Sequence, residues 1–157
     1  MIESLLWTTA TSLALAASSA TGTAASTSCD GSAETSRTIV LTFYNEGLVG
    51  RQPEQAFLRY MAPDFVEHKP DIPKGTREET SRFLAQIIAE IPEARWEIVR
   101  TIAEGDMVFL HARFTPASRG PSYALADIFR VKDCKIVEHW DVVGPPPKEQ
   151  ANPNSRF

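Results

Sequence analysis

The chain has 157 residues, of which 43% are hydrophobic, and its formal net charge is −4. This length and apolar content fit one domain built around one hydrophobic core. Because the charge is small and no run of Lys or Arg stands out, nucleic acid and acidic membrane surfaces are poor candidates as partners. No segment beyond the N-terminal leader has the length and apolarity of a membrane-spanning helix.

The first 28 residues differ in composition from the rest of the chain. An apolar run over residues 5–17 precedes a segment made almost entirely of Ala, Ser, Thr and Gly. This layout is typical of a secretory signal peptide, with cleavage after Ala20 or Ala25. The first three residues contain no Lys or Arg, so a disordered leader is the alternative. We expect a secreted, lumenal or periplasmic protein if the leader is cleaved, and a cytoplasmic one otherwise.

Three helices are predicted in the first part of the chain, from apolar residues that recur at helical spacing. The first begins at Glu34 and is closed by Gly47 and Gly50, the second covers 53–61, and the third covers 77–91. The second has Pro at its first turn, and Pro92 stops the third. A short extended segment, 64–69, lies between the second and third helices.

After Pro92 the hydrophobic period changes to two, which predicts strands. The expected strands are 96–104, 107–114, 123–131 and 135–143, with tight turns at Gly105-Asp106 and Asp133-Cys134. Helices followed by strands joined through short turns indicate an α+β fold, with an antiparallel sheet covered on one face. Residues 148–157 follow three prolines and are predicted to be a polar tail.

The chain has two cysteines, Cys29 directly after the leader and Cys134 in the last predicted turn. An oxidising compartment would permit a disulfide between them, which would attach the N-terminus to the sheet edge. Two unrelated thiols are the alternative, and the sequence leaves both open.

Asp127 stands in the middle of a predicted apolar strand, where an unpaired carboxylate would be costly to bury. It must therefore face a pocket or pair with a cation such as Arg113 or Arg100. Strand alternation places Asp127 between Leu125 and Phe129 on one face, and His139 between Val137 and Asp141 on one face of the next strand. If these faces coincide, an acid and an imidazole share an apolar wall and form a plausible acid/base pair.

Several segments resemble the SnoaL-like group of the nuclear-transport-factor-2-like superfamily. They are DIFRVKDCKIVEHWDVV at 127–143, FVEHKP at 65–70 with the following Gly75, and IAEGDMVFLHARF at 102–114. The resemblance covers 34–147 and implies a cone-shaped fold, in which three N-terminal helices pack on a curved antiparallel sheet and enclose a pocket. The chain also resembles the branch of this group that is described as predicted aldol-condensation enzymes. The superfamily includes cyclases, ketosteroid isomerases, epoxide hydrolases, dehydratases and non-catalytic binders, so fold alone does not decide function.

The resemblance implies a role for three candidate catalytic residues. Asp127 matches the strand carboxylate that acts as acid/base in SnoaL-like cyclases. His68 falls where ketosteroid isomerases place their general base, and His139 belongs to an EHWD motif common in this branch. A purely structural role is the alternative for each. The candidate ligand-binding residues are Tyr60, His111, Tyr123, Phe129, Trp140 and Asp141.

The sequence departs from the family pattern at the last hairpin turn. Family members usually carry Asp-Gly there, because Gly adopts positive φ at little cost. Cys134 occupies the glycine position, so it must either adopt a strained conformation or belong to a different turn.

The hypothesis that joins these observations is a cofactor-independent enzyme acting on a small apolar carbonyl compound, by aldol-type cyclisation or isomerisation. His68 or His139 would remove the α-proton, and Asp127 would donate to the developing enolate oxygen. A secreted small-molecule-binding domain without catalysis is the alternative, and a homodimer formed through the convex sheet face is expected. No metal site is predicted, since the chain has no HExxH or paired CxxC spacing.

Overall fold

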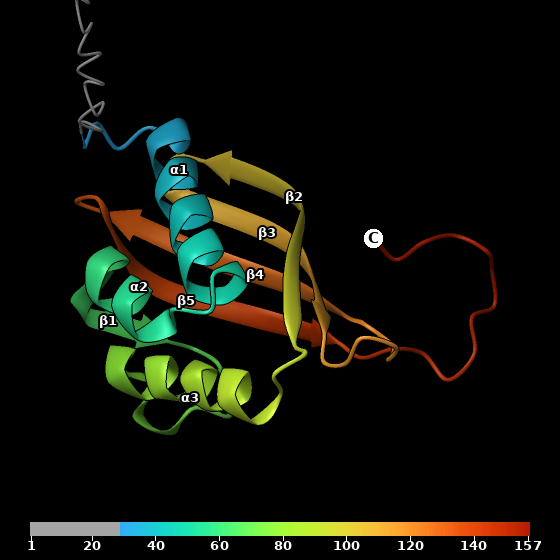
Figure 1. The fold of residues 1–157 in the computed structure, drawn as a ribbon. Coiled ribbons are helices and arrows are strands. Elements are labelled where there is room, and N and C mark those ends of the chain that lie inside the picture. Colours follow the sequence, from blue (N-terminus) through green and yellow to red (C-terminus); the bar gives the residue numbers. More distant parts are fainter. Residues whose placement is uncertain (1–28) are drawn as a thin grey trace, which may run out of the picture.

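The computed structural model describes residues 29–157, so the leader predicted for residues 1–28 lies outside the described residues. Three α-helices, a π-helical turn, a short 3-10 turn and five strands follow one another (Figure 1). In chain order they are α1 (Ala33–Tyr44), η1 (Asn45–Val49), α2 (Pro53–Tyr60), β1 (Met61–Glu67), η2 (Pro73–Gly75), α3 (Arg77–Glu90), β2 (Arg95–Glu104), β3 (Met107–Thr115), β4 (Tyr123–Lys132) and β5 (Lys135–Gly144).

Two of the helices begin at side-chain caps. The hydroxyl of Ser32 accepts a hydrogen bond from the backbone N–H of Thr35 at the start of α1. Thr76 does the same for Glu79 at the start of α3. These caps satisfy N–H groups that have no partner inside the helix, so the chain leaves its loops at defined residues.

The sheet has the strand order β1-β5-β4-β3-β2. All neighbouring strands are antiparallel except β1 and β5, which are parallel, so the predicted antiparallel sheet gains one parallel edge strand and is mixed. The parallel pair arises because α3 and three further strands separate β1 from β5, and the chain returns to β1 in the same direction. The pairing continues past the strand end, where the backbone N–H of His68 donates to the His139 carbonyl over 2.9 Å.

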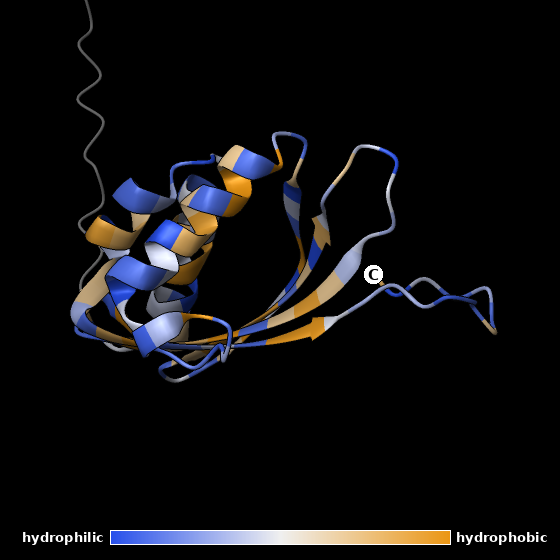
Figure 2. Cartoon of the chain, turned by 90° about the horizontal axis from the view of Figure 1, so that it is seen from below, coloured by the Kyte–Doolittle hydropathy of each residue, from blue (hydrophilic) through white to orange (hydrophobic). Residues whose placement is uncertain are grey.

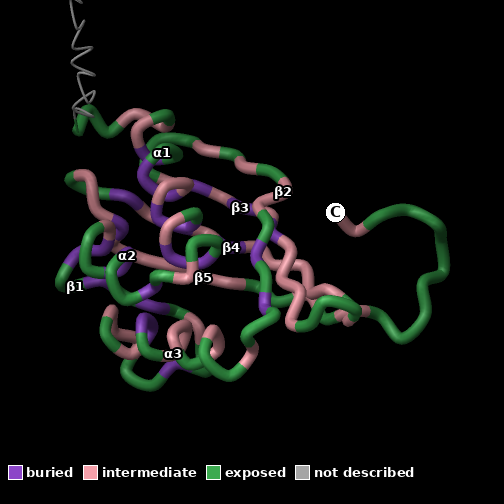
Figure 3. The backbone as a smooth tube through the Cα atoms, in the orientation of Figure 1, coloured by how far each residue is buried: buried purple, intermediate pink, exposed green. Residues whose placement is uncertain are grey.

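All three helices lie on one face of the bent sheet (Figures 1 and 2), as the α+β prediction requires. Buried positions lie on the helices and on the strands that they cover (Figure 3). Among them, the largest fully buried apolar side chains are Tyr44, Phe43, Phe57, Leu110, Ile136, Val40 and Val108. The helices therefore fix one wall of the interior, and the concave face of the sheet forms the other.

The last hairpin turn places two non-glycine residues in the left-handed region, Asp133 at φ 48° and Cys134 at φ 57°. Cys134 thus adopts the strained conformation that glycine would adopt freely. It also forms a disulfide with Cys29, with the two Cα atoms 5.4 Å apart. The bond attaches the segment preceding α1 to the β4–β5 turn.

The predicted polar tail contains no helix or strand, but its end returns to the sheet. Arg156 Nη2 donates to the carbonyl of Gly144 over 2.8 Å, and the guanidinium of Arg113 lies 4.2 Å from the centre of the Phe157 ring.

None of the helices described from residue 29 onward has the length and hydropathy that a membrane span requires.

Candidate active site

A cavity of about 230 Å³ lies between the helices and the concave face of the sheet. Most of its wall is aromatic or aliphatic, with side chains from all three helices and from all five strands. The apolar lining residues are Phe43, Leu48, Phe57, Met61, Ile72, Phe83, Leu84, Ile87, Trp96, Phe114, Leu125, Phe129 and Val143. Such a wall suits an apolar ligand with few polar groups.

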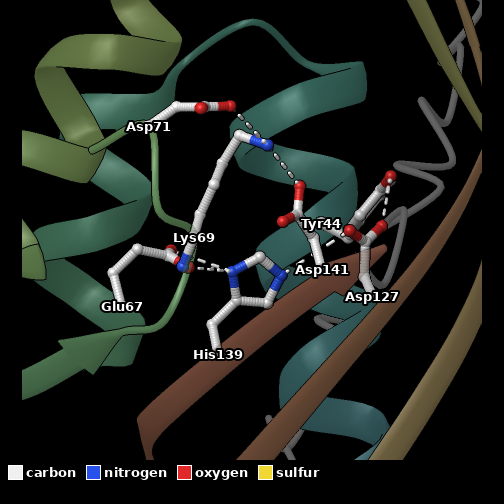
Figure 4. A network of polar contacts seen from close by, with 7 residues as sticks. All are labelled: Tyr44, Glu67, Lys69, Asp71, Asp127, His139 and Asp141. Carbon is white, nitrogen blue, oxygen red and sulfur yellow. Dashed lines mark hydrogen bonds and ion pairs between the residues drawn. The ribbon is translucent and has the colours of Figure 1, made fainter. Parts of the chain in front are cut away.

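A polar cluster interrupts this apolar wall, with His139 at its centre (Figure 4). The Nδ1 atom of His139 lies 2.8 Å from Oε2 of Glu67, and its Nε2 atom lies 3.6 Å from Oδ1 of Asp127. The side chains of Glu67, Asp127 and His139 are 1%, 8% and 15% exposed. An imidazole is therefore held between two buried carboxylates.

Strand register explains why these three side chains meet. Glu67 on β1 is the register partner of His139 on β5, and Phe129 on β4 is the partner of His139 on the other side. Asp127 lies two residues from Phe129 and therefore on the same face of β4. It is a diagonal neighbour of His139, within the reach of long side chains.

The surroundings of His139 favour its protonated form. Burial lowers the pKa of this imidazole, but the carboxylates of Asp127 and Glu67 outweigh that effect and raise the pKa from 6.5 to about 9. At neutral pH His139 is therefore an imidazolium, with a proton on each nitrogen.

Tyr44 holds the carboxylate of Asp127 in place. Its hydroxyl donates a hydrogen bond to Oδ2 of Asp127 over 3.1 Å, in a fully buried position. Burial and the charge of Asp127 raise the pKa of Tyr44 well above its usual value, so the hydroxyl keeps its proton and remains a donor. Asp127 thus accepts from Tyr44 through one oxygen, and its other oxygen faces His139.

The Nε2 atom of His139 is buried and has no hydrogen-bond partner within the described structure. Its 3.6 Å separation from Asp127 makes the pair an ion pair rather than a hydrogen bond. A buried N–H without an acceptor is uncommon and costly. His139 itself lines the cavity, so this unpartnered N–H lies close to the space that a ligand would fill.

Lys69 contributes a second ion pair to the wall. Its Nζ atom lies 2.9 Å from Asp141 and 3.4 Å from Asp71. Burial lowers the pKa of Lys69, but the hydrogen bonds and charges of these two carboxylates raise it overall. Lys69 therefore stays protonated, and its charge is neutralised by Asp141 and Asp71.

Comparison with known families agrees with this architecture. A family model described as a SnoaL-like domain matches residues 40–139, more than half of the chain. The chain belongs to the SnoaL-like family. A search of curated proteins gave no match. The resemblance inferred from the strand motifs is confirmed.

Solved structures share the fold of this SnoaL-like domain. TsrD from Streptomyces laurentii is 18% identical, with a TM-score of 0.58 over 69% of this chain and 87% of that one. A proposed SnoaL-like polyketide cyclase from Jannaschia sp. CCS1 is 20% identical, with a TM-score of 0.59 over 70% and 85%. An NTF2-like protein of unknown function from Mesorhizobium loti is 24% identical, with a TM-score of 0.59 over 72% and 93%. At these identities the likeness shows the fold alone.

The SnoaL-like structure brings Asp127 and His139 together at the cavity, but not His68. The His68 ring stacks on Trp140 with centroids 4.5 Å apart, and its Nε2 atom lies 3.3 Å from Glu138. The expected convergence of His68 with Asp127 is therefore corrected. The physical reason is alternation, because His68 follows the inward-facing Glu67 and must point to the opposite side of the sheet.

The six candidate ligand-binding residues divide in the same way. Phe129, Tyr123 and Asp141 line the cavity. Trp140 does not, since it stacks with His68 on the other face of the sheet. The remaining two lie elsewhere: the Tyr60 hydroxyl donates to Glu46 over 2.8 Å, and Nδ1 of His111 lies 2.7 Å from Arg100.

Four polar residues of the cavity were not among the sequence candidates: Tyr44, Glu67, Lys69 and Thr80. Glu67 could have been found by alternation from Phe65, a clear core residue that shares its face of the strand. Tyr44 belongs to the apolar stripe of α1, where a buried hydroxyl requires a partner. Over residues 29–157, no group of three or more His, Cys, Asp or Glu is arranged to hold a metal ion.

Proposed function

We propose that this SnoaL-like domain binds a small, largely apolar carbonyl compound and transfers a proton at the carbon next to the carbonyl. The observation that carries the proposal is the unpartnered Nε2–H of His139, buried beside the carboxylate of Asp127 in an apolar cavity. Membership of the SnoaL-like family supports a role of this class in small-molecule binding or chemistry.

The charge of His139 and the position of Asp127 assign the roles of the two residues. His139 is positively charged at neutral pH, so its Nε2–H donates to the carbonyl oxygen, where negative charge develops. Asp127 is the carboxylate beside His139 in the cavity wall, so it serves as the base that removes the α-proton. These roles are the reverse of those expected from the sequence, because two carboxylates, and not one, surround the imidazole.

The proton can then complete either of two reactions. In an isomerisation, Asp127 returns it to a different carbon of the conjugated enolate. In an aldol-type cyclisation, the enolate carbon attacks a second carbonyl of the same molecule, and the proton of Asp127 passes to the new alkoxide oxygen. Both reactions leave Asp127 and His139 in their starting states, and neither requires an oxidant or a reductant.

Hydrogen–deuterium exchange tests the proposal without knowledge of the natural substrate. The probe is 2-tetralone, an apolar bicyclic ketone with exchangeable α-protons, followed by NMR in D2O. We expect the protein to accelerate exchange, and Asp127→Asn to lower the rate by about 100-fold or more, because general-base catalysis contributes on this scale. Asp106→Asn is the matched control, since Asp106 is exposed in the β2–β3 turn beside Arg130. Equal rates for the wild-type protein and Asp127→Asn would remove Asp127 from the mechanism.

A binding domain without catalysis is the second candidate. It is favoured by the saturation of the polar wall, in which Lys69 already pairs with Asp141 and Glu67 already binds His139. The same experiment separates the two candidates. Saturable binding of 2-tetralone to the wild-type protein, with no acceleration of exchange, would support the binder over the enzyme.

We also propose that the protein functions in an oxidising compartment outside the cytoplasm. The Cys29–Cys134 disulfide supports this proposal, because disulfides persist in secreted and periplasmic proteins and are rare in the cytosol. Fractionation of the source cells, with thiol labelling of each fraction, tests it. The proposal requires the protein to be found outside the cytoplasm with both cysteines oxidised.

A further inference from the structure

We infer that Glu67 is a positioning residue for His139, whose carboxylate holds the Nδ1–H of the imidazole and thereby directs Nε2–H into the cavity. The inference rests on the proposed function, in which Nε2–H is the group that meets the substrate oxygen. Glu67 itself does not touch the reacting atoms in that mechanism. It acts through the ring that it orients.

The hydrogen bonds of Glu67 fix which nitrogen of His139 it holds. Its Oε1 and Oε2 atoms lie 3.0 Å and 2.8 Å from Nδ1 of His139. Oε1 also accepts the backbone N–H of Lys69 over 3.0 Å. Because the carboxylate accepts in both contacts, Nδ1 of His139 carries a hydrogen whether the ring is neutral or charged.

The backbone of Glu67 is held from two sides, so its carboxylate has a defined position. On one side Glu67 is in register with His139 of β5, and on the other Val66 forms an isolated bridge with Thr76. Gly75 passes so close to Glu67 that a Cβ at Gly75 would lie 2.5 Å from the Glu67 carbonyl oxygen. This loop therefore presses on the end of β1, where a larger residue than glycine has no room.

The other titratable groups of the cavity have partners of their own. Lys69 pairs with Asp141 and Asp71, and Tyr44 donates to Asp127. The carboxylates left to interact with the imidazolium are therefore Glu67 and Asp127. Glu67 makes the shorter contact, 2.8 Å against 3.6 Å, and its side chain is the more buried of the two. Removal of its charge should therefore change the proton affinity of His139 directly.

The test is an NMR titration of the His139 imidazole in Glu67→Gln, which keeps the shape and an acceptor oxygen but removes the charge. In the wild-type protein we expect the midpoint near the pKa of about 9. Glu67→Gln should lower that midpoint by one pH unit or more, a tenfold or larger loss of proton affinity. Glu138→Gln is the matched control, because Glu138 pairs with His68 outside the cavity, and it should leave the midpoint unchanged.

Two further readouts keep the inference falsifiable. If Glu67→Gln does not fold, the ¹⁵N shifts of the wild-type protein above the midpoint still report the neutral tautomer, which must carry its proton on Nδ1. An Nε2–H tautomer there, or an unchanged midpoint in Glu67→Gln, would overturn the role of Glu67. Glu67→Asp, which restores the charge, should recover most of the raised midpoint.

The titration also separates this inference from the proposed function. If the wild-type protein fails to exchange 2-tetralone protons while Glu67→Gln still lowers the His139 midpoint, the catalytic proposal fails and the positioning role stands. If exchange is catalysed, the exchange rate should fall at alkaline pH as the His139 imidazolium loses its proton. The pH at which the exchange rate falls should be lower in Glu67→Gln and unchanged in Glu138→Gln.

Discussion

The charge on His139 links the stability of the folded protein to pH. The folded pKa of about 9 lies above the ordinary value of 6.5, so the folded state binds this proton more tightly than the unfolded chain does. The resulting stabilisation is fully present below pH 6.5 and is lost as the pH rises through 9. A shift of this size corresponds to about 3 kcal/mol of unfolding free energy.

Urea unfolding at pH 6 and pH 10 measures this contribution. Lys and Tyr side chains also titrate near pH 10, so the informative quantity is a difference between proteins. We expect the wild-type protein and His68→Gln to lose about 3 kcal/mol more between these pH values than His139→Gln does. His68 is the control because its imidazole is 38% exposed and lies outside the cavity. An equal loss in all three proteins would contradict the raised pKa.

The sequence predicts part of the candidate site, and the reason lies in strand alternation. Asp127 is predicted because a carboxylate in an apolar strand needs an interior partner, and His139 is predicted because it belongs to the EHWD motif. His68 was selected from the family resemblance, although alternation from the buried Phe65 places Glu67 inward and His68 outward. Where the family resemblance and the strand alternation disagree, the alternation is the better guide to which residues face the cavity.

At the scale of the elements, local patterns predict the helices and hairpins well. The third helix was expected over 77–91 and ends at Glu90, and the last strand was expected over 135–143 and ends at Gly144. Local patterns could not reveal the direction of β1. Its partner is β5, about 70 residues later in the chain, and periodicity contains no information on which strands pair or on whether they run parallel. The Glu67–His139 contact depends on that pairing, so it was missed together with it.

The β4–β5 turn allows turn strain to be measured separately from the disulfide. Cys134 has φ 57°, a conformation that costs an L-residue about 1 kcal/mol and glycine very little. We therefore expect Cys29→Ser/Cys134→Gly to be more stable than Cys29→Ser/Cys134→Ser by about 1 kcal/mol. Urea unfolding of the two variants gives the difference, and neither can form the disulfide. A less stable glycine variant would show that the turn does not impose the positive φ.

The whole molecule encloses its cavity with elements from both halves of the chain, and this enclosure was predicted only through the family resemblance. Hydrophobic periodicity gave a helical layer and a sheet, which fixes the two layers but not the bend of the sheet between them. The sequence does not decide the pairing of Cys29 with Cys134 either, because two cysteines at the ends of a domain are compatible with free thiols as well as with a bond. Both features depend on contacts between distant parts of the chain.

The disulfide should be a large contribution to the stability of the whole domain. It joins residues separated by 105 positions, so it closes a loop that contains all three helices and most of the sheet. In the chain-entropy description, a cross-link over a loop of this length stabilises the folded state by about 5 kcal/mol, because the unfolded chain loses many conformations. We expect Cys29→Ser to lower the free energy of urea unfolding by about this amount.

Reductant supplies the control for that experiment. The wild-type protein in reductant should unfold at the same urea concentration as Cys29→Ser, and Cys29→Ser itself should not respond to reductant. The bond lies at the β4–β5 turn, whereas His139 contacts Glu67 and Asp127 further along the strands. The NMR midpoint of His139 should therefore be the same in reduced and oxidised protein wherever both are folded. Equal stability of the oxidised protein and Cys29→Ser would show that the bond closes a loop that other contacts already hold in the unfolded chain.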